Sequence, residues 1–575
     1  MLVNSIGFKW FSMVSYFIYA VVSYILALQF RDGLLINVLF IFPLVVLIML
    51  ALYHHEYENL KINYKSTVLL LVLGIVNFWL HYNVSIKYQT STFYGAVCHN
   101  SANLITLGSI LAYYGCLNRS WNFEKHFWIL GVTFGTVMMF MLPLRAVPDE
   151  NMHIYTAYQM SELMMNHIQS KEEEIPMRKT DREIFIEPVE MNYDIEMAER
   201  QYSLSVISAD LSYSETLSED SVLWNHDMAY LVSASAMTLA KALNLNGFYT
   251  IMAGRIANLF LYLVLCYFAV KMIPFNKMIP AGIACLPMSL QQGMSYSYDS
   301  LIISSSLFVV SATLYLYFKA EESTQKKYLY IGAITLFSIP LVMLKSHAYF
   351  LIGLFPLFMY LHKCYDMSKM MRIVTFISVI FIALFVTYAF IEYFMDFPDV
   401  LSEPSNPIKW SDNQQGYTIQ FFINNPLKMI YVFVRTFIIN FSYYWRSAVS
   451  SHLGWLNIIT SSKNVFVFSI LLLLDAQKSG DKEMMNIDGT IKTYSAYTVL
   501  ITVFGIVLAL FITWTPLWST VSQGVQGRYF IPIMIFLLLM IRNRKVVFEE
   551  KNQLLLFFVT EMTLIMFFAS FLVRL

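Results

Sequence analysis

The sequence predicts an all-α membrane protein that crosses the membrane many times. Of its 575 residues, 58% are hydrophobic and only 13% are charged, which lies outside the range of soluble globular proteins. Apolar windows of membrane-spanning length recur along the chain, and the 16% of aromatic residues suits interfacial belts as well as helix packing. We expect a bundle of about 14 to 15 transmembrane helices, whose external loops carry interfacial helices.

The charge and cysteine content argue against nucleic-acid binding and against a metal site built from cysteines. The 38 basic and 38 acidic residues cancel, so the chain has no basic footprint for nucleic acid. The five cysteines are scattered in or beside apolar segments without metal-ligand spacing, and we interpret them as buried thiols. The first apolar run follows Lys9 and has no small-residue cleavage site, which favours a retained span over a signal peptide.

Five apolar windows precede an acidic pair, Asp149 and Glu150. These windows are 10–30, 34–53, 67–82, 97–116 and 127–145. The loops with Lys61 and Lys65, and with Arg119 and Lys125, are cytoplasmic by the positive-inside rule. Five crossings from a cytoplasmic N-terminus place Asp149 outside, which removes cytosolic nucleotide cofactors from the expected reactants.

The polar segment 146–230 is an acidic external loop, with amphipathic helical pieces rather than strand alternation, and we expect it to pack on the membrane surface. The later windows are 245–272, 279–296, 298–318, 328–345, 347–362, 373–393, 463–475, 493–515, 528–542 and 553–572. Residues 428–445 then begin and end outside, so we interpret them as a re-entrant or interfacial helix, with an additional span as the alternative.

A candidate site begins at Pro148-Asp149-Glu150. Asp149 is a good N-cap, and on the helix that follows Asp149, Glu150 and His153 share one edge, as an acid-base cluster would. The alternative is an interfacial helix whose first turn is acidic because the helix dipole favours it there.

Four further polar residues fall on the same predicted side as Asp149: Arg255, Asp299, Lys345 and Arg528. Each has a simpler interpretation, since the cations could extend to lipid headgroups and Asp299 could cap its helix. Together, carboxylates, cations and aromatic residues at one membrane face suit a lipid-linked phosphosugar, because cations hold the phosphate and a carboxylate removes a hydroxyl proton.

Five motifs support this interpretation: Pro148-Asp149-Glu150 with His153, Tyr155-Thr156-Ala157-Tyr158-Gln159, Ser297-Tyr298-Asp299, Gly454-Trp455-Leu456, and Gly524-Val525-Gln526-Gly527-Arg528-Tyr529-Phe530 with Pro532. In these motifs the sequence resembles a bacterial family of polytopic membrane proteins, usually labelled as of unknown function and placed in the GT-C glycosyltransferase superfamily. The resemblance covers 127–545. It implies a GT-C-like core at 127–545 that includes loop 146–230, an N-terminal extension of four transmembrane helices at 1–126, and a C-terminal transmembrane helix at 546–575.

The resemblance also implies roles for residues. Asp149 would be the general base, with Glu150 or His153 as a second polar contact, and Arg528, Arg255 and Lys345 would neutralise the departing phosphate. Asp299, Tyr158, Trp455 and Gln526 are expected to contact substrate. An acidic pair is compatible with a divalent metal ion, but two carboxylates and one histidine do not establish a metal site.

The implied activity is the transfer of a sugar from a polyprenyl-phosphate donor to a cell-envelope glycan, at the extracytoplasmic side of the bacterial cytoplasmic membrane. Two alternatives from other classes remain open in the sequence. One is a flippase or other transporter of lipid-linked oligosaccharides, and the other is a non-catalytic membrane protein of polysaccharide assembly.

Overall fold

The computed structural model describes most of the chain from residue 64 onward. The described residues are 64–88, 92–117, 123–170, 174–186, 195–206, 210–217, 227–318, 323–365, 367–378, 380, 384, 406–479, 487–542, 547–548 and 550–574. They are mostly helical, with three two-stranded sheets. The predicted windows 10–30 and 34–53, and most of 373–393, lie outside the described residues.

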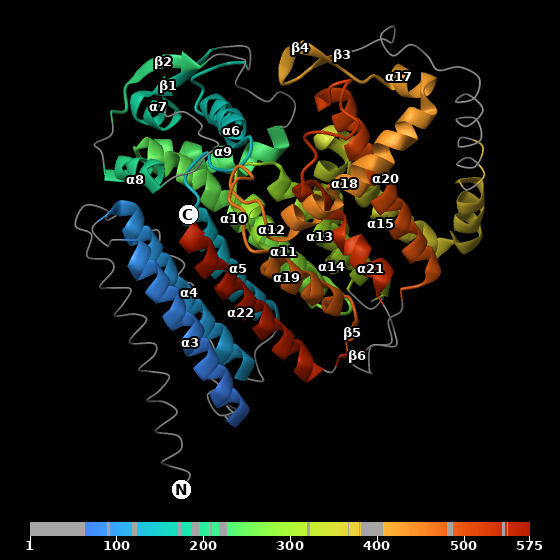
Figure 1. Cartoon of the computed structure of the whole chain (residues 1–575), viewed down its shortest axis with the longest axis horizontal. Coiled ribbons are helices and arrows are strands. Elements are labelled where there is room, and N and C mark those ends of the chain that lie inside the picture. The colour runs from blue at the N-terminus through green and yellow to red at the C-terminus, as the bar shows by residue number, and fades with distance from the viewer. Residues whose placement is uncertain are drawn as a thin grey trace.

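The two ends of the described chain pack together. Three helices follow one another at the N-terminal side: α3 (Tyr64–Lys87), α4 (Phe93–Leu117) and α5 (Phe123–Met141). The last helix, α22 (Glu550–Arg574), lies along α3 and α4 (Figure 1). The hydroxyl of Tyr88 donates to the carbonyl of Leu572 at 2.7 Å, so the predicted N- and C-terminal units share one interface.

The segment between α5 and the next long helix contains strands as well as helices. Its elements are α6 (Glu150–Met164), β1 (Ile175–Arg178), α7 (Lys179–Ile186), α8 (Ile195–Ser203), η2 (Leu204–Val206), β2 (Tyr213–Leu217) and α9 (Asp227–Ala242). Strands β1 and β2 pair antiparallel, with Ile175 opposite Leu217. The expectation of helices alone was therefore wrong, because the pairing joins residues about forty apart and local periodicity does not report it.

The middle of the chain is a set of packed helices. They are α10 (Gly247–Met272), α11 (Met278–Ala284), α12 (Pro287–Met294), α13 (Asp299–Phe318), α14 (Thr324–Met343), η4 (Lys345–His347) and α15 (Phe350–Cys364). The predicted single span 279–296 is wrong: it is broken between α11 and α12. Pro287 begins α12, and Leu286 before it has φ −58° and ψ 138°, the extended backbone that a following proline favours.

The C-terminal third brings a long amphipathic helix against the centre. Its elements are β3 (Asn406–Ile408), β4 (Ser411–Gly416), α17 (Ile419–Asn424), α18 (Pro426–Val449), α19 (Ser462–Asp475), β5 (Lys478–Ser479), α20 (Gly489–Trp514), η6 (Gly527–Ile533), α21 (Met534–Ile541) and β6 (Val547–Phe548). The helix predicted at 428–445 is present as α18, continuous over 24 residues. Val434, Ile438 and Phe441 are exposed on it, whereas its C-terminal part packs on η6.

Four described helices are long and apolar enough to cross a membrane: α10, α13, α14 and α20. Three shorter apolar helical stretches accompany them, at Phe350–Cys364, Gly527–Ile541 and Val559–Leu572. The helical fold of a membrane protein is thus confirmed at this level, while the total of about 14 to 15 spans stays a prediction.

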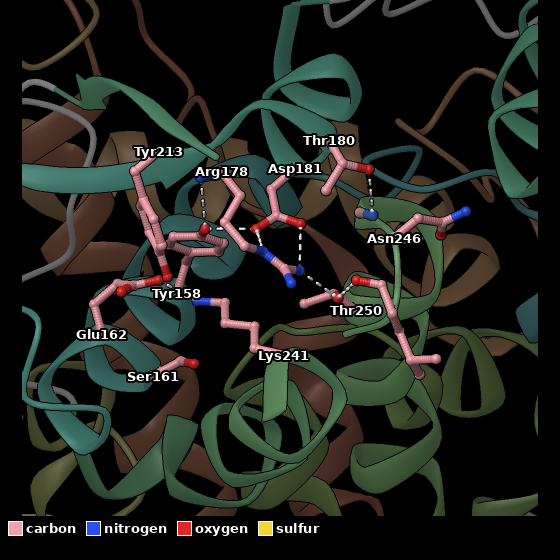
Figure 2. A network of polar contacts seen from close by, with 12 residues as sticks. Tyr158, Ser161, Glu162, Arg178, Thr180, Asp181, Tyr213, Lys241, Asn246 and Thr250 are labelled. Atoms are coloured by element: carbon pink, nitrogen blue, oxygen red, sulfur yellow. Dashed lines mark hydrogen bonds and ion pairs between the residues drawn. The ribbon is translucent and has the colours of Figure 1, made fainter. Parts of the chain in front are cut away.

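A buried polar network fastens the α6–α9 segment to the helices beneath it (Figure 2). Arg178 binds both carboxylate oxygens of Asp181, at 2.7 and 2.8 Å, and donates to the hydroxyl of Thr250 on α10 at 2.9 Å. The Tyr158 hydroxyl donates to Asp181 at 2.6 Å. Lys241 pairs with Glu162 at 2.6 Å, 3.3 Å above the Tyr158 ring. Both buried cations have a carboxylate partner, which is the condition under which buried charge is tolerated.

Replacing Arg178 tests how much this network contributes to stability, and replacing the adjacent Lys179 is the control. Arg178→Met leaves Asp181 buried without its cation, so we expect the free energy of unfolding to fall by about 3 to 5 kcal/mol. Lys179→Met removes only the exposed pair with Asp210, whose side chains are 50% and 56% exposed, and should leave the unfolding midpoint nearly unchanged. Thermal unfolding of the detergent-purified variants measures both; equal midpoints would contradict the structural role of the network.

Candidate functional site

The turn between α5 and α6 is held by one buried arginine. Arg255 of α10 donates to the carbonyls of Leu142 at 2.6 Å and Pro143 at 2.7 Å, and more distantly to Met139 at 3.3 Å. A cation at the C-terminal end of a helix satisfies carbonyls that have no partner within the helix. Arg255 therefore fixes where α5 ends and where the chain turns toward Asp149.

Glu150 completes this arrangement from the other side of the turn. Its carboxylate binds Arg255 at 2.5 and 2.9 Å, and both side chains are fully buried. It also accepts the backbone N–H of Arg145 at 3.0 Å. The geometry gives Glu150 and Arg255 a positioning role, because each is occupied by the other.

The side chain of Asp149, unlike that of Glu150, is exposed to solvent. Asp149 occupies the N-cap position of α6, as the sequence predicted, but its backbone is left-handed with φ 62° and its side chain makes no capping hydrogen bond. The carboxylate is 57% exposed instead, and Oδ2 lies 3.3 Å from Nη2 of Arg528. The acidic pair is thus divided into one buried carboxylate and one open to solvent.

Two cations and a second carboxylate adjoin Asp149. Lys345 of η4 pairs with Oδ1 of Asp299 at 2.6 Å, and Nε of Arg528 lies 3.3 Å from Oδ2 of the same carboxylate. The Arg528 side chain is only 4% exposed, and its Nη1 is buried without a hydrogen-bond partner among the described residues. We call Asp149, Asp299, Lys345 and Arg528 the charged cluster. These ion pairs contradict the simpler interpretation that the side chains of Lys345 and Arg528 extend to lipid headgroups.

Aromatic rings enclose the cations of the cluster. The Lys345 ammonium lies 3.6 Å from the centroid of the Tyr529 ring and 5.5 Å from that of Tyr298, and the Arg528 guanidinium lies 5.3 Å from the Tyr529 centroid. Such contacts stabilise a cation that has lost part of its hydration. Both tyrosines belong to the motifs quoted above, but the sequence analysis selected only the charged residues beside them. Their position next to Asp299 and Arg528 in the sequence could have identified them as site residues.

The other predicted site residues lie outside the charged cluster, and three of them have partners of their own. The Nδ1 atom of His153 lies 2.6 Å from the hydroxyl of Tyr230, and its ring packs edge-on against Tyr298. Trp455 donates to the carbonyl of Arg145 at 2.8 Å, which ties its turn to the Asp149 loop. Tyr158 is fully buried in the network of Figure 2. The Oε1 atom of Gln526 is buried without a hydrogen-bond partner among the described residues.

These placements revise the predicted acid-base edge of α6. Asp149, Glu150 and His153 each engage a different partner, Arg528, Arg255 and Tyr230, so the three side chains do not form one cluster. Helical spacing places residues on one face only when all of them are helical, and the left-handed backbone at Asp149 removes it from the regular series.

A close approach of two backbones positions Arg528. A Cβ atom at Gly527 would lie 2.1 Å from the carbonyl oxygen of Tyr444 and 2.3 Å from the amide nitrogen of Ala448, so only glycine fits against α18. The Gly527 N–H donates to the Ser447 hydroxyl at 3.2 Å. Glycine at 527 therefore lets η6 and α18 meet at their backbones.

Backbone strain concentrates at the cluster. Asp149 has φ 62°, and Lys345, Ser346 and His347 have φ 51°, 52° and 63° in succession. Each non-glycine residue held in this region costs on the order of 1–3 kcal/mol, and such residues gather at functional sites. The surrounding packing holds these side chains in place against that cost.

The charge state of Lys345 depends on pH in the neutral to alkaline range. Burial lowers the pKa of its ammonium from 10.5 to about 8, although Asp299 opposes the shift. Lys345 is therefore a cation below about pH 8 and loses its charge above it.

Among the described residues, no group of three or more His, Cys, Asp or Glu side chains is arranged to hold a metal ion.

The fold and the apolar helices define a helical membrane protein. Residues 132–537 match the model of a protein family described as "Predicted membrane protein (DUF2142)". The match covers well over half of the chain, and the chain belongs to this family. No curated protein and no solved structure matches it.

The Arg255–Glu150 pair is expected to determine stability through its buried charges. Arg255→Met leaves a buried carboxylate and the α5 carbonyls without their donor, at an expected cost of about 3–5 kcal/mol. Adding Glu150→Gln removes the isolated charge, so the double variant should be more stable than Arg255→Met alone. Thermal unfolding in detergent measures the order; the exposed Arg435→Met is the control, and a double variant no better than the single one would contradict the assignment.

Proposed function

We propose that this protein is a glycosyltransferase that moves a sugar from a polyprenyl-phosphate-linked donor to an extracytoplasmic glycan of the bacterial envelope. One observation carries the proposal: the exposed carboxylate of Asp149 lies beside the buried guanidinium of Arg528, in a cluster that also holds Lys345. A base next to a cationic pocket is the pair of groups that glycosyl transfer from a phosphate requires.

Asp149 is the proposed general base. The acceptor hydroxyl oxygen bonds to the anomeric carbon of the sugar, and its proton passes to the Asp149 carboxylate. The bond between the anomeric carbon and the phosphate oxygen breaks, and its electron pair leaves with the phosphate. Exposure of Asp149 supports this role, because a base has to reach an incoming hydroxyl.

Arg528 and Lys345 are the proposed partners of the leaving phosphate. Negative charge grows on the phosphate as the bond breaks, and fixed cations in a partly dry site stabilise it strongly. Arg528 retains a buried Nη1 donor without a partner among the described residues, which suits an incoming oxygen. When phosphate binds Arg528, the contact of Asp149 with Arg528 weakens and the carboxylate becomes available to the acceptor.

The test of the catalytic assignment is Asp149→Asn, which keeps the shape of the side chain and removes its basicity. We expect sugar transfer to fall by about 10²- to 10⁴-fold at unchanged protein level. Asp210→Asn, an exposed aspartate of the same segment, is the matched control and should retain activity. Transfer of labelled sugar from prenyl-phosphate donor in reconstituted vesicles is the measurement, with envelope sugar content of a complemented deletion strain as the cellular readout. Normal transfer by Asp149→Asn would refute the proposal.

The phosphate role of Lys345 predicts a pH dependence. The Lys345 pKa is about 8, so its charge is present at pH 7 and lost at pH 9.5. Binding of citronellyl phosphate, a short prenyl phosphate, should weaken by about tenfold over that interval because one charge-assisted contact disappears. Lys345→Arg stays charged throughout and should show little change. Calorimetric titration at the two pH values decides; an equal loss in both proteins would exclude Lys345 as the titrating group.

A further inference from the structure

The charged cluster has no net charge to offer an anion. Asp149 and Asp299 balance Lys345 and Arg528, and each carboxylate lies within 3.3 Å of a cation. A phosphate that enters this cluster must share cations that are already paired. A substrate with more than one negative group would need a further cation nearby that no carboxylate neutralises.

Arg446 is such a cation. It lies in the last turn of α18, and within the described parts of the chain no carboxylate forms an ion pair with it. Its Nε atom is buried and has no hydrogen-bond partner among those residues. A partly buried guanidinium with an unused donor is costly unless a ligand supplies the acceptor.

Tyr443 connects Arg446 with the charged cluster. It lies one helical turn before Arg446 on α18, where residues three apart are neighbours. The carbonyl oxygen of the next residue, Tyr444, lies against Gly527, which precedes Arg528 in the chain. The Tyr443 ring also packs edge-on against that of His452, with centroids 5.0 Å apart. The N–H of Ser451, the residue before His452, donates to the Arg446 carbonyl at 2.8 Å, so the backbone places His452 next to the end of α18.

The turn that carries His452 is built into the wall of the site. Gly454 exchanges two hydrogen bonds with the Gln291 side chain, at 2.9 and 3.3 Å, and Trp455 binds the Arg145 carbonyl of the Asp149 loop. His452 and Leu456 have φ 60° and 70°, so this turn shares the left-handed backbone seen at Asp149 and Lys345. Because Gln291 of α12 and the Asp149 loop both hold this turn, His452 has a fixed place against Tyr443 of α18.

We infer that Arg446, with the neighbouring His452, forms a second anion subsite, which takes the second phosphate group of a prenyl diphosphate-linked substrate. The inference rests on the proposed function and makes it more specific. The first phosphate binds Arg528 and Lys345 in the charged cluster. The second binds the guanidinium of Arg446, which forms no ion pair among the described residues and whose planar fork of donors suits phosphate oxygens.

The experiment compares citronellyl diphosphate with citronellyl monophosphate on the full-length protein purified in detergent. Calorimetric titration should give a dissociation constant about tenfold lower for the diphosphate, the gain of one charge-assisted contact. Arg446→Met should abolish this difference while leaving monophosphate affinity unchanged. Unchanged monophosphate affinity also shows that the variant is folded.

Arg435→Met is the matched control, since Arg435 lies on the same helix and is exposed. It should preserve the advantage of the diphosphate. Equal binding of both probes by the unmodified protein, an advantage that persists in Arg446→Met, or a loss of both probes in that variant would each overturn the separate subsite. The first two results leave the base role of Asp149 intact, because that role is measured by sugar transfer in Asp149→Asn.

Discussion

The bidentate pairing of Arg255 with Glu150 is the constraint on which the site depends. Both side chains are fully buried, and Arg255 also binds carbonyls at the end of α5. Breaking either partner would leave a charge in a medium that cannot solvate it, so the turn has one favourable conformation. That conformation places Asp149 at the start of α6 in a left-handed backbone, with its carboxylate toward Arg528 rather than toward its own helix. In our proposal, a residue outside the charged cluster therefore decides where the base stands.

The charged cluster is assembled from four distant parts of the chain, and each part is held by a different kind of contact. The ion pair fixes Asp149, the close backbone contact at Gly527 fixes Arg528, and three successive left-handed residues fix Lys345. Asp299 joins the two cations from the start of α13. The cations are packed on tyrosine rings before any ligand arrives, which is the preorganisation that our proposal requires.

Sequence patterns predicted the long helices well. Windows 245–272 and 298–318 correspond to α10 and α13 within two residues at each end, because a continuous apolar run of about twenty residues has few other solutions in a membrane protein. Apolarity alone did not reveal the break before Pro287, although the proline itself was a signal. The pairing of β1 with β2 was also missed, since it depends on contacts between remote residues.

For the site, the sequence by itself determined which residues were candidates: charged and aromatic side chains that are expensive beside apolar spans and that recur in recognisable motifs. Only the tertiary structure decided how these candidates divide, with Asp149 open beside Arg528, and Glu150 and Tyr158 closed within buried networks. The physical reason is that the energy of a charged side chain depends on the groups that surround it in space. Ion pairing and desolvation act over a few ångströms in space, and here they join residues separated by tens to hundreds of positions in the chain.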